Sequence, residues 1–235
     1  MKVLFFSDVH ANMYALKEIL KVDCDKAIFL GDMVDYGTSP VETVEKIREI
    51  ADYAVMGNHD YAAAFNKDCL CSQENHELSV FTRENITLKE LGKNELNYLQ
   101  KLPDYMEIDL DGVQFNLVHG SPTDHLYGYL YPWKLSAAMF TSLTGRSIDE
   151  GTFVVGHTHH QFLLSFGHIR IINPGSAGQP RDDSPYPSYV VYDSKKQSFE
   201  MNRFRYDTSA FKKELLEKVS DEFHRKKLIE LFRLT

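Results

Sequence analysis

Residues 2–10 read Lys-Val-Leu-Phe-Phe-Ser-Asp-Val-His, an apolar run that ends directly in polar residues. A continuous apolar run of this length is typical of a strand that is buried on both faces, as in a parallel sheet covered by helices. In such sheets the functional side chains lie beyond the carboxyl ends of the strands. The stretch therefore predicts a buried strand and, after it, a functional loop that contains Asp8 and His10.

Strands and helices alternate in the segments that follow. Asn12–Lys21 carries its apolar residues on one helical face, and Ala27–Leu30 is a second buried strand. Ser39 and Pro40 have the order of an N-cap and a first helical residue, and Ala51–Met56 is a third strand. This alternation predicts an α/β core.

The remainder of the chain is expected to complete a single domain over residues 1–235. A polar helical pattern predicts a helical excursion at about residues 61–103. The strands expected after it are Tyr105–Leu110, Val113–Val118, Phe153–Val155, Phe162–Ser165, Ile169–Ile172, Ser188–Tyr192 and Gln197–Arg205. Amphipathic helices at about residues 209–234 are expected to pack against the sheet.

The composition excludes several classes of protein. With 43% hydrophobic and 26% charged residues the chain is ordinarily globular. A net charge of -8 disfavours stable nucleic-acid binding, although bound dications would reverse the sign locally and admit small anionic substrates. No segment approaches the roughly 18 apolar residues that cross a membrane. Cys24, Cys69 and Cys71, without a signal peptide, predict free thiols in a cytoplasmic protein.

Five short motifs each place a metal-competent side chain directly after an apolar run. They are Asp8-Val9-His10, Gly31-Asp32, Gly57-Asn58-His59-Asp60, Val118-His119-Gly120 and Gly156-His157-Thr158-His159. Each has a structural alternative, since a single histidine usually serves packing and an aspartate after a strand usually caps a turn. The tetrapeptide at residues 57–60, however, arises by chance in roughly one chain of this length per thousand. Five such motifs in order favour convergent ligands.

The motif set resembles the calcineurin-like metallophosphoesterases, whose pattern is D-x-H, G-D, G-N-H-D/E, H and G-H-x-H. The similarity runs from residue 3 to about residue 192. It looks closest to the bacterial and archaeal phosphodiesterase branch, because of Tyr36-Gly37-x-x-Pro40, His119-Gly120-Ser121-Pro122 and the stretch from Asn173 to Arg181. The resemblance implies a four-layer α/β/β/α sandwich, in which two mixed sheets are flanked by helices and the metals lie between the sheet edges.

The resemblance also implies the ligands of two divalent transition-metal ions, from among manganese, iron, zinc, nickel and cobalt. One ion would be held by Asp8, His10 and His159, the other by Asn58, His119 and His157, and Asp32 would bridge both. Carboxylate and imidazole ligands suit these metals, and the absence of thiolates argues against a purely structural zinc site. The implied reaction is in-line attack on phosphorus by a water or hydroxide that bridges the metals.

Further roles follow from the same resemblance. His59 would face the leaving group as a general acid or an electrostatic stabiliser, and Asp35 matches the position that orients this histidine. Tyr36 stands where protein phosphatases carry an arginine clamp, which disfavours a phosphoprotein substrate. We predict substrate contacts from Asn58, Tyr36 and Arg181, although Arg181 could equally be a surface residue that caps a turn.

Aromatic residues are concentrated in the loop 127–133. Such rings can stack on a nucleobase, but we expect them to fill a hydrophobic cluster under a long loop. His125 and His160 are expected to be ordinary surface residues.

The sequence therefore predicts a metal-dependent phosphodiesterase that acts on small phosphodiesters or nucleotides. The alternatives are a phosphomonoesterase, including a protein or sugar-phosphate phosphatase, a nuclease, and a non-catalytic scaffold on the same fold. A scaffold should have lost ligands, whereas all seven are present. The metals that are loaded, the substrate and the oligomeric state stay open.

Overall fold

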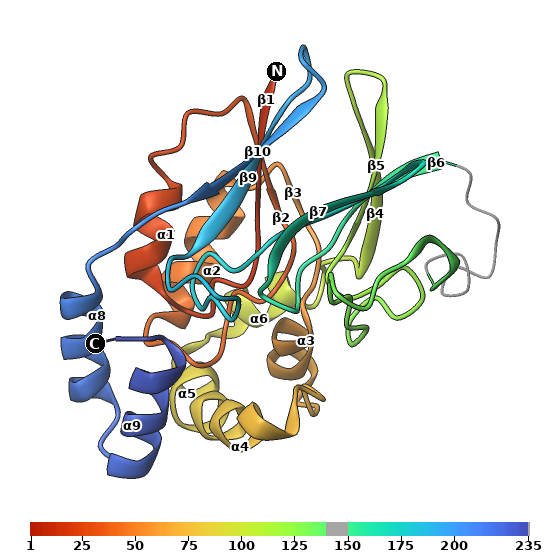
Figure 1. Ribbon diagram of the computed structural model, residues 1–235. Helices are drawn as coiled ribbons and strands as arrows, with labels where there is room; N and C mark the ends of the chain where they lie inside the picture. Colours follow the sequence, from red (N-terminus) through yellow and green to blue (C-terminus); the bar gives the residue numbers. More distant parts are fainter. Residues whose placement is uncertain (140–149, 235) are drawn as a thin grey trace.

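The structure is a computed structural model that describes residues 1–139 and 150–234 (Figure 1). Two five-stranded sheets of mixed direction lie against each other, with the strand orders β10-β9-β1-β2-β3 and β4-β5-β6-β8-β7. The first sheet contains β1 (Lys2–Phe6), β2 (Lys26–Phe29), β3 (Tyr53–Ala54), β9 (Ser188–Asp193) and β10 (Ser198–Arg203). The second contains β4 (Tyr105–Leu110), β5 (Val113–Val118), β6 (Glu150–Val154), β7 (Gln161–Phe166) and β8 (His168–Pro174).

The apolar run at the N-terminus forms β1 in the centre of the first sheet. It pairs in parallel with β2 and antiparallel with β9. Because side chains alternate along a strand, Val3 and Phe5 enter the core between the sheets, whereas Leu4 and Phe6 lie in the core beneath the helices. Both faces of β1 are buried, which explains why its sequence shows no polar alternation.

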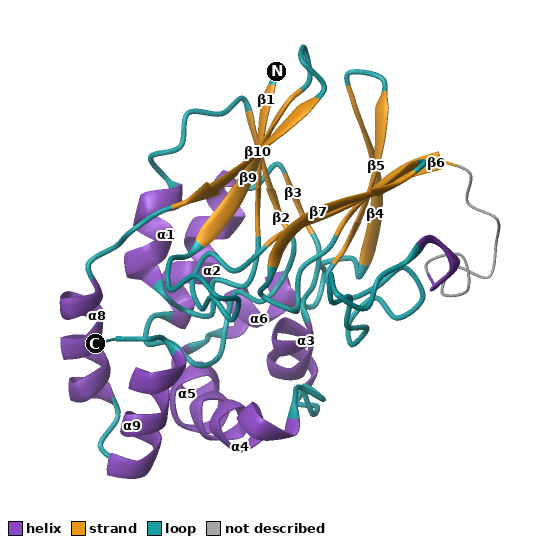
Figure 2. Ribbon diagram, in the orientation of Figure 1, coloured by secondary structure: helices purple, strands orange, loops and turns teal. Residues whose placement is uncertain are grey.

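Most helices lie on the outer side of the first sheet and beyond the strand ends (Figure 2). They are α1 (Met13–Ile19), α2 (Pro40–Ile50), α3 (Asn58–Phe65), α4 (Gln73–Thr82), a π-helical turn (Arg83–Thr87), α5 (Leu88–Glu90), α6 (Lys93–Leu99), α8 (Thr208–Lys218) and α9 (Glu222–Leu231). The predicted excursion is helical and begins three residues early, at Asn58. Ser39 makes no capping bond to α2, because its hydroxyl donates to Glu214 of α8 at 3.1 Å instead.

The C-terminal helices bury an apolar face as predicted, but their main partners are other helices and not a sheet. Phe211, Leu215 and Leu228 are completely buried in a cluster with Tyr36 and Leu78. Helix α8 packs on α1, and α9 packs on α4. Since α1 and α2 already cover the outer face of the first sheet, α8 and α9 extend that helical layer.

The outer face of the second sheet is covered, within the described ranges, by the segment that follows β5. Phe162 and Ile171 of this sheet pack with Leu130 and Leu135 of that segment. Two mixed sheets flanked by helices confirm the predicted α/β sandwich. Among the helices described, none has the length and apolar character required to cross a bilayer.

Candidate metal centre

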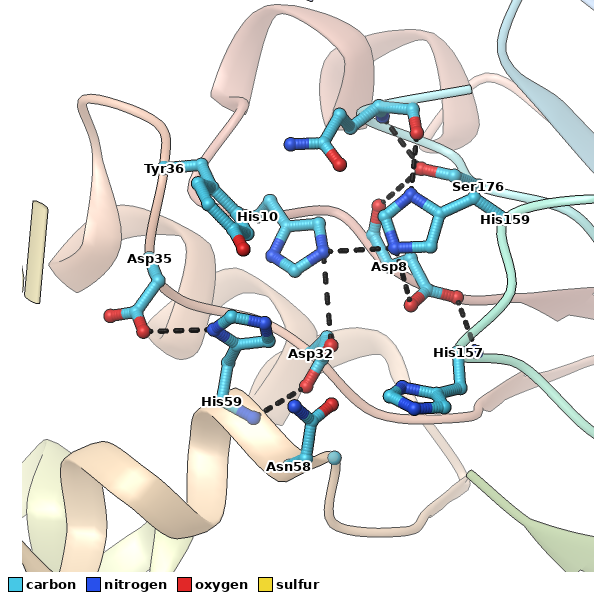
Figure 3. A network of polar contacts seen from close by, with 12 residues as sticks. Asp8, His10, Asp32, Asp35, Tyr36, Asn58, His59, His157, His159 and Ser176 are labelled. Carbon is cyan, nitrogen blue, oxygen red and sulfur yellow. Dashed lines mark hydrogen bonds and ion pairs between the residues drawn. The ribbon is translucent and has the colours of Figure 1, made fainter. Parts of the chain in front are cut away.

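The predicted ligands converge where the strand ends of the two sheets meet (Figure 3). The first sheet contributes Asp8, His10, Asp32 and Asn58, and the second contributes His119, His157 and His159. All seven side chains come from turns that directly follow a strand, or from the helix that begins there. The position of the site thus follows from the topology, because both sheets end their ligand-bearing strands at one edge.

Five of the ligands adopt a left-handed backbone conformation, which is rare for residues other than glycine. The φ angle is 55° at Asp8, 49° at His10, 67° at Asp32, 65° at His157 and 58° at His159. Each such residue costs on the order of 1–3 kcal/mol and persists only where its surroundings enforce it. Here the N–H of Asp8 donates to Gly31 O at 2.9 Å, and that of His10 donates to Asp32 O at 3.1 Å. The strained turns therefore hold their side chains in fixed directions.

Asp8, His10 and His159 form a first group, whose ligand atoms all lie within 4.8 Å of one another. The Nε2 atoms of His10 and His159 are 3.3 Å apart, and Oδ1 of Asp8 lies 3.2 Å from Nε2 of His159. Metal–nitrogen bonds of about 2.1 Å place neighbouring ligand atoms about 3 to 3.5 Å apart. The spacing fits three ligands of one cation.

Asp32, His119 and His157 form a second group, again within 4.8 Å. Nε2 of His119 lies 3.3 Å from Oδ2 of Asp32 and 3.1 Å from Oδ1 of Asn58. The same Oδ2 of Asp32 is 3.7 Å from Nε2 of His10 in the first group. One carboxylate oxygen is therefore placed between the two groups, as a bridging ligand requires.

Hydrogen bonds behind the rings determine which nitrogen faces the site. Nδ1 lies 3.0 Å from Val34 O in His10, 2.7 Å from Leu30 O in His119 and 2.5 Å from Gln179 O in His159. Because a carbonyl oxygen only accepts, each Nδ1 carries the proton, and a neutral ring turns the lone pair of Nε2 toward the other ligands. His10 and His159 thus direct two lone pairs at each other, which a cation between them would satisfy.

The electrostatics of the donor set fit transition-metal ions. Oδ1 of Asp8 and Nε2 of His157 are buried without a hydrogen-bond partner in the described part of the chain. Burial lowers the pKa of His10 to about 3, which keeps the ring in the neutral form that binds metals. Burial opposes the charged form of His119 too, but the Asp32 carboxylate raises the pKa of His119 to about 9, so a proton competes with a cation there.

His59 lies beside the two groups and is backed by a buried ion pair. Its Nδ1 is 2.9 Å from Oδ2 of Asp35, and its backbone N–H donates to Oδ1 of Asp32 at 2.9 Å. Nε and Nη2 of Arg83 donate to the same oxygen of Asp35 at 2.9 and 2.7 Å. Burial opposes the charged form of His59, but the Asp32 charge and the Asp35 hydrogen bond raise its pKa. The arrangement favours a protonated imidazole.

Sequence reasoning did not find the roles of Arg83 and Asp60. Arg83 comes from the π-helical turn and is only 5% exposed. Asp60 is buried, and its carboxylate accepts the N–H groups of Asp32, Met33 and Gly57 at 2.8, 2.8 and 3.1 Å. Burial and the Asp32 charge raise the pKa of Asp60 to about 7. Asp60 belongs to the motif Gly57-Asn58-His59-Asp60, so a role for it could have been inferred from the sequence. Arg83 offered no such evidence, because an arginine in a polar helical stretch resembles any solvated residue.

Tyr36, predicted to contact the substrate, is completely buried beside two histidines. Its ring centroid lies 5.0 Å from that of His10 and 4.9 Å from that of His59. The hydroxyl group is 3.7 Å from the sulfur of Cys71. In this position Tyr36 supports the two rings from the side.

The amide of Asn58 is oriented by the segment that contains the two neighbouring cysteines. Its Nδ2 donates to Cys69 O at 2.7 Å, which leaves Oδ1 facing His119. Cys69 and Cys71 are free thiols as predicted, and their sulfur atoms lie within 4.8 Å of a ring nitrogen of His59. These cysteines therefore form part of the wall behind His59.

The segment from Asn173 to Arg181 braces the ligand turns. Nδ2 of Asn173 donates to Gly156 O at 2.7 Å, and the hydroxyl of Ser176 donates to Asp8 O at 2.6 Å. Gly178 packs so closely on the backbone of the residue after Asp8 that a Cβ would overlap a carbonyl oxygen. The turns on both sheets are thereby tied to a single segment.

Arg181, for which we predicted a substrate contact, lies next to His159, and its backbone N–H donates to His159 O at 3.5 Å. Its Nε and Nη2 donate to Oε1 of Gln179 at 3.0 and 2.7 Å, which orients the guanidinium. Burial and then the charge of Arg181 lower the pKa of His159. His125, in contrast, pairs with Asp104 at 3.2 Å and belongs to neither ligand group.

Contrary to the expectation from the sequence, the rings of the aromatic loop 127–133 do not fill a hydrophobic cluster. Leu130 enters the core at 2% exposure, whereas Trp133 is 64% exposed. The ring of Tyr129 lies 4.1 Å from that of the ligand His157, and Trp133 contacts His160 edge-on at 5.0 Å. Neighbouring side chains of a non-helical segment leave the backbone in different directions, so Leu130 and the flanking rings do not share one cluster. His160 is correspondingly part of an aromatic contact and not an isolated surface residue.

Comparisons with known proteins agree with this geometry. The profile of the calcineurin-like phosphoesterase superfamily domain matches residues 1–197. The chain belongs to this superfamily. An uncharacterized protein of Methanocaldococcus jannaschii is 32% identical over 227 residues, which cover 87% of this chain and 88% of that protein.

Two solved structures are similar to this chain. A metallophosphoesterase from Sphaerobacter thermophilus is 32% identical, with a TM-score of 0.78 over 97% of this chain and 98% of the other. A hypothetical protein from Pyrococcus horikoshii is 16% identical and shares the fold, with a TM-score of 0.79 over 97% of both chains. Superfamily membership confirms the predicted family and supports a metal-dependent phosphoester hydrolase.

Proposed function

We propose that this phosphoesterase hydrolyses small phosphodiesters, including those of nucleotides, with two divalent transition-metal ions. The observation that carries the proposal is the position of Asp32, whose Oδ2 lies 3.7 Å from His10 and 3.3 Å from His119. This carboxylate joins two groups of converging lone pairs beside a histidine that is set up to carry a proton. A stable fold would not by itself require such an arrangement of buried acceptors.

The chain would hold the ions with side chains that are already in place. We assign Asp8, His10 and His159 to one ion and Asn58, His119 and His157 to the other, with Asp32 shared. When bound, the ions supply Lewis-acid charge for the phosphate oxygens and an activated water as nucleophile. The backbone bonds behind the rings keep the ligands in these directions, so little reorganisation opposes the reaction.

His59 is assigned as the general acid. Its Nδ1–H donates to Asp35, so the ring presents Nε2–H as the proton for the leaving-group oxygen. Burial opposes ionisation of Asp35, but the His59 hydrogen bond and the Arg83 charge lower the pKa of Asp35. Asp35 is therefore a positioning residue that keeps the His59 ring protonated and correctly turned, and Arg83 is a positioning residue that keeps Asp35 ionised.

The charges near the site favour a monoanionic diester over a dianionic monoester. Arg83 is paired with Asp35 at 2.7 Å, and Tyr36 occupies the place of the arginine clamp of protein phosphatases. Arg181 is then the cation that we assign to the phosphate, together with the amide of Asn58. The net charge of -8 and the free thiols are consistent with a cytoplasmic enzyme that has no stable nucleic-acid partner, which we propose as well.

The test compares bis(p-nitrophenyl) phosphate with p-nitrophenyl phosphate on manganese-reconstituted protein. We expect faster turnover of the diester, and we expect His59→Ala to lower it about 100-fold or more while metal content is kept. His125→Ala removes a histidine outside both ligand groups and is the matched control. Faster turnover of the monoester would identify a phosphomonoesterase instead. Metal binding without turnover of either ester would indicate a scaffold.

A further inference from the structure

An aromatic row leads away from the ligand His157. It consists of Tyr129, Tyr131 and Trp133, which are spaced by two residues. The ring of Tyr129 lies 4.1 Å from that of His157. The next rings follow at centroid distances of 5.7 and 4.9 Å, with interplanar angles of 10° and 25°. Leu130 lies between two of these residues in the chain but is buried in the core of the second sheet. The row therefore connects the metal centre with the protein surface.

The rings of the aromatic row overlap only in part. Phe81 and His224 show what full overlap looks like in this protein, with centroids 3.7 Å apart and an interplanar angle of 4°. At 4.9 and 5.7 Å, nearly parallel rings are offset, so each ring covers only part of the face of its neighbour. Trp133 ends the row at 64% exposure, which core packing alone would not produce. The row offers flat, incompletely covered surface.

Neighbouring side chains fix the orientation of the row. His160 meets Tyr131 and Trp133 edge-on, at 5.6 Å and 85° and at 5.0 Å and 71°. Nζ of Lys134 lies 5.4 Å from the ring centroid of Tyr131. The hydroxyl of Tyr129 is buried and has no hydrogen-bond partner among residues 1–139 and 150–234. A ring system held in this way loses little freedom when a ligand stacks on it.

We propose that the aromatic row binds the planar base of a nucleotide whose phosphate lies at the metal centre. The inference rests on the proposed function, because the phosphate anchors the ligand beside His157. Every nucleobase has a π-face, so stacking requires no hydrogen-bond pattern, whereas an aliphatic alcohol has no planar ring to stack. The net charge of -8 opposes an anionic polymer, so the occupant is a small nucleotide and not an oligonucleotide.

The chain contains one tryptophan, Trp133, so tryptophan emission reports only on the outer end of the row. Zinc-loaded protein is titrated with AMP and with ribose 5-phosphate, which carries a phosphate but no base. We expect saturable quenching by AMP and none by ribose 5-phosphate. An equal response to both compounds, no response to AMP, or quenching that does not saturate would overturn the proposal.

Variants connect the quenching with stacking. Tyr131→Ala should weaken AMP binding about tenfold, whereas Tyr131→Phe keeps the ring and should restore it. Tyr53→Ala removes a half-buried tyrosine at β3, in the other part of the fold, and is the matched control. Loss of AMP binding in Tyr131→Phe as well would contradict a stacking role, because only the hydroxyl is removed.

A kinetic experiment separates this proposal from the proposed function. Thymidine 5′-(p-nitrophenyl) phosphate and methyl p-nitrophenyl phosphate share a leaving group and differ in the other ester group, which is a nucleoside in the first and a methyl group in the second. We expect the nucleotide ester to have the higher kcat/KM in wild type and the ratio to fall about tenfold in Trp133→Ala. A ratio near one in wild type would overturn the base site. Hydrolysis of neither ester would overturn the proposed function, and the fluorescence titration would still decide whether AMP binds the row.

Discussion

The metal centre and the aromatic row are neighbours that are held in place by different forces. Asp8 and His159 are at most 2% exposed, and backbone hydrogen bonds hold their strained turns. Trp133 is 64% exposed and is held by contacts between rings. Stabilising charge on a phosphate requires fixed groups away from water, whereas stacking on a flat ring tolerates small displacements. Under the function that we propose, the sheets fix the groups that act on the phosphate, and the loop beside them selects the substrate.

The largest effect is expected for Asp32→Asn, which removes the charge shared by both ligand groups. An asparagine can still accept the N–H of His59, so the turn should persist. We expect a loss of activity of about a thousandfold or more, since the bridging charge contributes several kcal/mol. Turnover and metal content are measured together, with the exposed Asp104→Asn as control. Wild-type activity in Asp32→Asn would contradict the assignment of Asp32 as the ligand shared by both ions.

Arg83→Met tests whether the buried ion pair between Arg83 and Asp35 stabilises the fold around the site. Arg83 is 5% exposed, and its loss removes the guanidinium that pairs with the Asp35 carboxylate at 2.7 Å, so that only His59 still balances this buried charge. We expect the free energy of unfolding to fall by about 3–5 kcal/mol, as measured by urea denaturation. The double variant Arg83→Met with Asp35→Asn should recover most of that loss, because no unpaired charge then remains. A single variant as stable as wild type would contradict this account.

The convergence of the candidate ligands was predictable because of where these residues lie in the chain. Asp8, Asp32 and His119 each follow an apolar strand directly, and strand ends meet at one sheet edge. Arg83 was not predictable, because its partner Asp35 is 48 positions away and a helical arginine usually lies in solvent. Local patterns show which residues are chemically competent, whereas long-range ion pairs depend on the tertiary structure.

The same distinction applies to apolar surfaces. The stripe that contains Phe211 and Leu215 predicted a buried helical face, and that face is buried. Its partners are α1 and α4 and not a sheet, because an amphipathic pattern carries no information about what covers it. In the aromatic loop the residue types suggested either a cluster or a stacking surface. The structure decides between these two alternatives, because Leu130 is the only residue of the loop 127–133 that is buried.

Leu130→Ala should separate the anchor of the loop from its exposed rings. Leu130 is 2% exposed in the core of the second sheet, so its truncation should lower the free energy of unfolding by about 2–4 kcal/mol. Tyr131→Ala, one residue away, should change it by about 1 kcal/mol or less. Urea denaturation of both variants provides the measurement. Equal losses would mean that the aromatic row is part of the core after all.

The smallest effect is expected for His160→Ala, and it is the sharpest test of whether the two regions are independent. His160 follows the ligand His159 directly but contacts Tyr131 and Trp133 edge-on. One such contact contributes about 0.5 kcal/mol, so we expect AMP affinity to fall about two- to threefold, with a shift in Trp133 emission. Metal content should stay at the wild-type level, whereas His157→Ala in the same turn should reduce it. If His160→Ala also lost metal, the turn would act as one unit, and the separation between a fixed reaction site and an adjustable binding surface would fail.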